Sequence, residues 1–79
     1  MERDEILNEF GLRIRGLRIS KGLSQEKLGH ICNLDRTYIS GIERGVRNPS
    51  LVGIYNIALG LGISLEDLFK YISVDNNEN

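Results

Sequence analysis

The sequence predicts an all-α domain, and three observations lead to that prediction. Apolar residues recur at steps of three and four, beginning with Leu7, Phe10 and Ile14, which places them on one face of a helix. No stretch alternates apolar and polar residues over the length of a strand. Pro49 is the only proline, so the segments on either side of it can form helices without interruption.

The first two helices are bounded by residues that favour helix ends. One helix is expected from about Asp4 to Lys21, and Gly22 ends it because glycine readily adopts the positive φ found after a helix. Ser24 is expected to cap the second helix, since its hydroxyl can accept a hydrogen bond from a free backbone N–H. The second helix is expected to end near Cys32.

Three further helices follow the same pattern of caps and stops. The expected N-terminal caps are Asp35 and Ser64, the latter in a capping box with Asp67, and Pro49 and Ser50 are expected to open the fourth helix. The expected left-handed stops are Asn33, Gly45 and Gly62. The side chains expected to face inward are Leu28, Ile31, Ile39, Ile42, Leu51, Ile54, Ile57, Ala58 and Leu61. Five short helices then form one domain over residues 1–73, followed by a polar flexible tail at 74–79.

The distribution of charge indicates an anionic partner, although the formal net charge of the 79 residues is only -1. Residues 11–48 carry a net charge of +5, and residues 1–10 and 49–79 each carry -3. A basic segment between acidic ones is typical of a surface that binds a polyanion. A solvated surface without a partner would also account for it.

Residues 24–45 have the dimensions of a helix-turn-helix, whose second helix enters the major groove of DNA. Ile39 and Ile42 are expected to face the core. The side expected to face outward holds Thr37, Ser40, Gly41 and Arg44, with Arg36 and Tyr38 on its flanks. Such side chains hydrogen-bond to base edges and phosphates. Gly41 is expected to let the helix backbone approach DNA closely, and Gly29 is expected to mark another close approach of backbones.

The stretch from Gly16 to Phe69 resembles the lambda-repressor-like (XRE) helix-turn-helix family along nearly its whole length. Within it, the segment LDRTYISGIERGVRNPSL is most similar to controller proteins of restriction-modification systems. The resemblance implies a five-helix lambda-repressor-like fold and a dimeric, autoregulatory transcription regulator that activates and represses its operon. Its partner would be a pseudo-palindromic double-stranded DNA operator, with no cofactor and no small-molecule ligand.

The resemblance also implies roles for individual residues. Together with Arg44 from the outward face, the expected DNA contacts are Gln25, Arg36, Thr37, Tyr38, Ser40, Arg47 and Asn48. Arg18 matches one half of an ion pair with Glu43 in the family, so a structural role and a direct DNA contact both remain open. Glu26 matches a position that contacts RNA polymerase in activating members, but the residue type favours a solvated Glu, which is stabilising near a helix N-terminus.

A homodimer is expected because a single recognition helix from a small domain binds DNA weakly. Its interface is expected on the fourth and fifth helices and the residues after them, at Leu59, Leu65, Phe69, Tyr71 and Ile72.

Several classes of function are not expected. One His and one Cys leave no metal site, disulfide framework or catalytic triad, so an enzyme is not predicted. No apolar run is long enough to cross a membrane and no signal peptide begins the chain, so a cytoplasmic location is expected. An antitoxin-type or phage-type repressor, whose acidic C-terminal half also binds a protein, is the alternative, and co-purification of a small partner would favour it.

Overall fold

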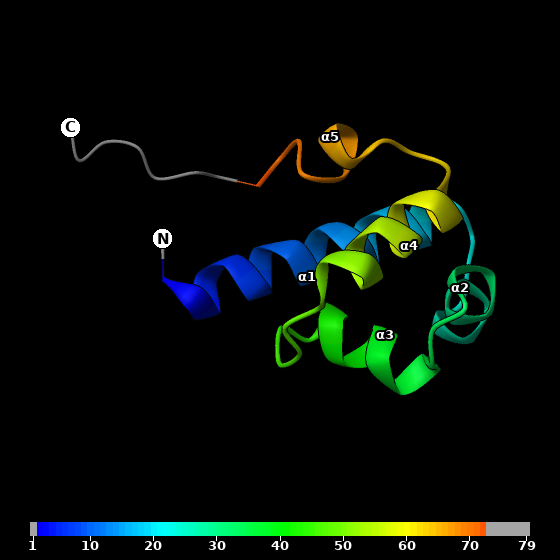
Figure 1. Ribbon diagram of the computed structural model, residues 1–79, viewed down its shortest axis with the longest axis horizontal. Helices are drawn as coiled ribbons and strands as arrows, with labels where there is room; N and C mark the ends of the chain where they lie inside the picture. Colours follow the sequence, from blue (N-terminus) through cyan, green and yellow to red (C-terminus); the bar gives the residue numbers. More distant parts are fainter. Residues whose placement is uncertain (1, 73–79) are drawn as a thin grey trace.

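The computed structural model describes residues 2–72, and all regular structure in this range is helical (Figure 1). The helices are α1 (Arg3–Ser20), α2 (Gln25–Cys32), α3 (Arg36–Glu43), α4 (Leu51–Leu61) and α5 (Leu65–Leu68). No strand occurs between residues 2 and 72, so the predicted all-α, five-helix fold is confirmed. The tail expected at 74–79 lies outside the described residues.

The helix ends follow the caps that the sequence predicts. The side chains of Ser24, Asp35, Ser50 and Ser64 each accept a hydrogen bond of 2.9–3.0 Å from a backbone N–H in the first turn of the helix that follows. The residues with positive φ after helices are Gly22, Asn33, Gly45 and Gly62, as expected. At Ser64 only the bond from the Asp67 N–H is formed, which is half of the capping box that was expected.

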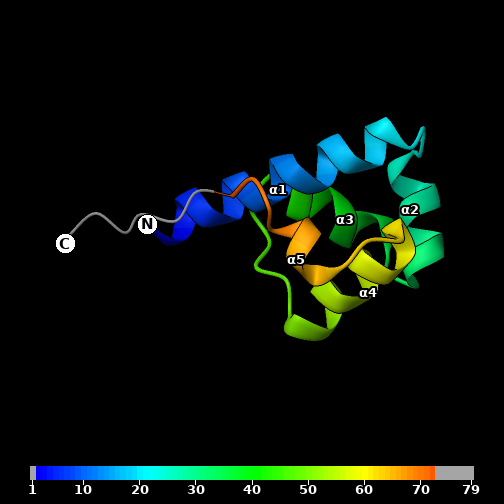
Figure 2. The ribbon, with the colours of Figure 1, turned by 90° about the horizontal axis from the view of Figure 1, so that it is seen from above.

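The core lies between α1, α2, α3 and α4, and α5 covers one side of it. Figure 2 shows α5 between α1 and α4, and a stacked pair of rings, Phe10 and Phe69, joins α1 to the residue after α5 at 5.4 Å. The buried apolar cluster consists of Phe10, Ile14, Leu28, Cys32, Ile39, Ile42, Ile57, Ala58, Leu61, Leu68 and Ile72. Gly11 brings α1 onto the end of α3, because a Cβ there would lie 2.7 Å from the Glu43 carbonyl oxygen. α3 is therefore fixed against the longest helix.

Two inward predictions are wrong. Ile31 is 43% exposed, and Cys32 occupies the core instead. α4 crosses α2 closely at Gly60, where an added Cβ would meet the Cys32 sulfur and the Ile31 side chain. Leu51 is also exposed, at 76%, at the first position of α4.

Ile72 corrects the predicted dimer interface, since it is only 8% exposed and belongs to the core of the single chain. The Arg13 guanidinium donates hydrogen bonds to the carbonyl oxygens of Asp67 (2.6 Å) and Leu68 (3.2 Å). These bonds hold the end of α5 against α1, and the following residues turn back so that Ile72 packs inward. No helix in the described part of the chain is long and apolar enough to span a membrane.

Candidate nucleic-acid interface

The turn between α2 and α3 is short and tightly packed. Asn33 adopts the left-handed conformation at φ 58°, and the Leu34 N–H donates to the Gly29 carbonyl oxygen at 2.8 Å. A Cβ at Gly29 would lie only 2.5 Å from the Leu34 carbonyl oxygen. Gly29 therefore marks a close approach of backbones, as predicted, and this approach fixes the angle between the two helices.

One side of α3 is buried and the other is polar and cationic. Ile39 and Ile42 are almost fully buried against α1 and α2. The outward face of α3 consists of Arg36, Thr37, Ser40 and Arg44, of which all but the half-buried Ser40 are exposed. Its side chains are donors that hydrogen-bond to base edges or phosphates. The first three of them line a shallow cleft, and Arg44 Nε donates to Ser40 Oγ at 3.4 Å.

Gly41 does not belong to that face, which corrects the prediction. It is buried beneath the segment that joins α3 to α4. The backbone N–H groups of Val46 and Arg47 both donate to the Gly41 carbonyl oxygen, at 3.0 and 3.1 Å. A Cβ at Gly41 would lie 3.1 Å from the Arg47 Cβ. Gly41 therefore allows the loop, and not DNA, to approach the helix.

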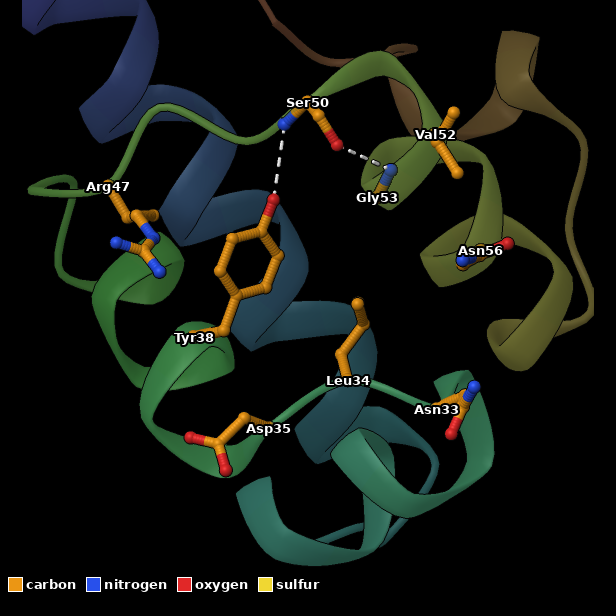
Figure 3. Close-up of a pocket in the computed structure, with 9 residues that line it drawn as sticks. All are labelled: Asn33, Leu34, Asp35, Tyr38, Arg47, Ser50, Val52, Gly53 and Asn56. Carbon is orange, nitrogen blue, oxygen red and sulfur yellow. Dashed lines mark hydrogen bonds between the residues drawn. The ribbon is translucent and has the colours of Figure 1, made fainter.

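Tyr38 joins this loop to the start of α4 (Figure 3). Its hydroxyl oxygen accepts a hydrogen bond of 3.1 Å from the Ser50 N–H, while Ser50 caps α4 through the Gly53 N–H. The Arg47 guanidinium lies over the Tyr38 ring, 4.8 Å from its centroid. Arg47 and Asn48 are themselves exposed. The half-buried Tyr38 thus holds Arg47 at the edge of the outward face of α3.

Arg18 forms the ion pair with Glu43 that the resemblance implied. Arg18 Nε lies 2.6 Å from Glu43 Oε2, and the two side chains are only 12% and 3% exposed. A second bond joins Arg18 Nη2 to Glu43 Oε1 (3.0 Å), and Arg18 Nη1 donates to the Leu23 carbonyl oxygen at 2.7 Å. Hydrogen bonding to Glu43 raises the pKa of Arg18 above its usual value, against the opposing effect of burial. Arg18 therefore joins α1 to α3 and to the segment before α2, and a contact of Arg18 with DNA stays a prediction.

Gln25 lies beside this pair. Its side-chain amide donates to Glu43 Oε1 at 3.1 Å, so Glu43 accepts bonds from α1 and α2 together. Glu26, the next residue, is exposed in the first turn of α2. Gln25 is thus held at the N-terminus of α2, where free backbone N–H groups favour an anion.

The residues predicted for a dimer interface come from α4, from α5 and from the segment after α5. Leu59 is exposed on a stripe along α4 that also holds Leu51, Val52 and Tyr55. Leu65 and Phe69 are each about 40% exposed at α5. Tyr71 is exposed but lies against α1, where the Arg13 guanidinium is 4.8 Å from its ring centroid.

Comparisons with known proteins agree with this geometry. Residues 14–68 match the helix-turn-helix family HTH_3. Control protein C.BamHI of Bacillus amyloliquefaciens is 49% identical over 70 residues, which cover 87% of this chain and 86% of that protein. Control protein C.MunI of a Mycoplasma species is 47% identical over 70 residues, covering 87% and 95%. The crystal structure of the restriction-modification controller protein C.AhdI from Aeromonas hydrophila superposes with a TM-score of 0.78 at 52% identity, covering 80% of this chain and 96% of that one.

Proposed function

This chain belongs to the helix-turn-helix family HTH_3 of DNA-binding transcription regulators, and we propose that it is the autoregulatory controller of a restriction-modification operon. The observation that carries the proposal is the outward face of α3, which is polar and cationic, in a chain about half identical to two control proteins. In this proposal α3 enters the major groove and reads the operator sequence.

The DNA-contacting residues fall into two groups. Arg36, Thr37 and Ser40 contact base edges from the outward face of α3, and Arg44 and Tyr38 flank them. Gln25 and Arg47 bind phosphates, Gln25 with the N-terminus of α2 and Arg47 from the loop that also carries Asn48. Support comes from the exposure of Arg47 and from the hydrogen bond that holds Gln25 at the helix end.

Gel-shift titrations with operator and random duplexes at several salt concentrations test this division. Arg47→Ala should weaken binding to both duplexes and lower the salt slope by about one unit. Thr37→Ala should instead reduce the ratio between operator and random affinities, with the salt slope retained. Arg3→Ala, which removes a charge from the opposite, N-terminal end of α1, is the control and should leave the ratio unchanged. The same loss in both variants would contradict the division, and no preference for any duplex would refute the proposed function.

The regulator acts as a homodimer that reads two half-sites about 34 Å apart. The exposed stripe of α4 supports this, since Leu51, Tyr55 and Leu59 lie on one side of the helix and are 50–76% exposed. Leu65 and Phe69 extend the apolar surface at α5. A patch of this kind on a small protein is typical of a protein interface.

Sedimentation tests the dimer. Leu59→Lys should yield a folded monomer, because a buried lysine without a partner opposes association. Ile19→Lys is the control, since Ile19 is also exposed but lies at the end of α1. A dimer that withstands Leu59→Lys would remove α4 from the interface.

Regulation then follows from two operator sites. A dimer on a tighter distal site recruits RNA polymerase, with Glu26 as the contact, and a dimer on a weaker proximal site blocks it. The exposure of Glu26 beside Gln25 supports the contact. In a promoter-reporter assay Glu26→Gln should lower activation while operator affinity is retained.

A further inference from the structure

Val46 is an apolar residue in a polar and cationic part of the surface. Its side chain is 67% exposed, and Arg44, Arg47 and Asn48, which surround it in sequence, are exposed as well. The other large exposed apolar side chains between residues 2 and 72 lie on α1, α2, α4 and α5 or just after α5. Sequence reasoning assigned Val46 no role.

The Val46 side chain is also held in place. The Val46 N–H donates to the Gly41 carbonyl oxygen at 3.0 Å, and the N–H of the preceding Gly45, at φ 77°, donates to Ile42 O at 3.0 Å. Val46 Cγ2 lies 3.9 Å from the point where a Gly41 Cβ would stand. Because valine is branched at Cβ, few side-chain conformations remain open to it. Its methyl groups are therefore presented beside the outward face of α3 before any partner binds.

We propose that Val46 is a specificity-determining residue that packs its methyl groups against the C5-methyl group of a thymine in the operator. The inference rests on the proposed function, which places the outward face of α3 in the major groove. Thymine presents there the one apolar group that distinguishes it from the other bases. Arg44 and Arg47 attract the anionic duplex to this loop. Burial of the Val46 side chain against a methyl group is favourable, because it removes apolar surface from water, whereas a phosphate offers no apolar contact.

A double-mutant cycle tests the contact. The wild-type protein first selects a tight-binding duplex from a random pool, and each thymine is then replaced singly by deoxyuridine, which removes only the methyl group. At one thymine in each half-site the replacement should weaken wild-type binding about three- to fivefold, the value of one buried methyl group. Val46→Ala should weaken binding to the original duplex by a similar factor and should be insensitive to deoxyuridine at that thymine.

Ile19→Ala is the control, because Ile19 is also an exposed apolar residue but lies at the end of α1, outside the loop and the proposed dimer surface. It should show no coupling to any thymine. Val46→Thr keeps the branched shape and replaces one methyl group by a hydroxyl, so it should retain part of the coupling. Thermal unfolding of each variant checks that the fold is intact. The inference is overturned if the effects of Val46→Ala and deoxyuridine on affinity are additive at every thymine. It is also overturned if Val46→Ala lowers affinity equally for all sequences, as loss of a contact with a sugar would. Failure of the wild-type protein to select any sequence would instead refute the proposed function.

Discussion

Replacing Arg18 by methionine should be among the most destabilising single changes in this chain. The substitution leaves the Glu43 carboxylate, only 3% exposed, with Gln25 as its one remaining donor among residues 2–72. Breaking a buried ion pair from one side costs about 3–5 kcal/mol, because the other charge stays buried and unpaired. A domain of 79 residues has a stability of roughly 4–12 kcal/mol. A loss of about 3 kcal/mol should therefore lower Tm by about 12–24 °C.

The cost should come from the unpaired charge, and a second substitution separates that cause from lost packing. Adding Glu43→Leu to Arg18→Met removes the stranded carboxylate, and buried pairs replaced by apolar residues are often as stable as the original. The double variant should recover to within about 1–2 kcal/mol of wild type. The remaining deficit includes the bond from Arg18 Nη1 to the Leu23 carbonyl oxygen, worth about 1 kcal/mol.

Urea and thermal unfolding, followed by circular dichroism at pH 7 and one fixed protein concentration, measure these differences. Arg15→Met is the matched control, since Arg15 lies on the same helix with its side chain exposed, and it should change stability by less than about 0.5 kcal/mol. A loss below 1 kcal/mol for Arg18→Met would refute the reasoning, as would a double variant less stable than the single one. Operator affinity retained by the folded double variant would exclude a DNA contact of Arg18.

Three further predictions concern stability. Gly11→Ala should be strongly destabilising, because the new Cβ would meet carbonyl groups of α3. A Cβ at Gly16 has nothing within 4 Å, so Gly16→Ala should stabilise α1 by about 0.5–1 kcal/mol. Urea unfolding compares the two variants. Burial raises the pKa of the Cys32 thiol, so the unfolded chain ionises first and stability should fall as pH rises above about 8.5. Cys32→Ala should lack this pH-dependent component, and equal slopes in the two proteins would contradict it. Ser50→Ala removes the cap bond to the Gly53 N–H and should cost about 1 kcal/mol in thermal unfolding.

The helix boundaries could be predicted from the sequence because they depend on interactions within a few residues. Ser24 caps α2 through a bond to an N–H three residues later, and Gly62 ends α4 through its own backbone conformation. Neither depends on how the helices pack. The buried side of α3 was also predictable, since Ile39 and Ile42 are the only large apolar side chains of that helix apart from Tyr38.

The errors arise where packing between helices decides burial. Ile31 and Cys32 are adjacent and both lie where α4 crosses α2 at Gly60, yet only Cys32 is buried. Ile72 is buried because Arg13 holds the end of α5 against α1, an interaction between residues more than fifty positions apart. Gly41 was placed outward because a helix wheel contains no information about the loop that returns over it.

That loop explains how a protein with a net charge of -1 can present a surface suited to DNA. Arg47 is held by the Tyr38 ring and, through its N–H, by the Gly41 carbonyl oxygen, so its position is set before binding. Ordering a flexible side chain on association costs about 0.5–1.5 kcal/mol of conformational entropy. A side chain that is already ordered avoids most of this cost. The Ser50 N–H in turn fixes the Tyr38 hydroxyl to the start of α4. Local charge and prior ordering of the loop, more than the charge of the whole chain, therefore determine the suitability of this surface for a polyanion.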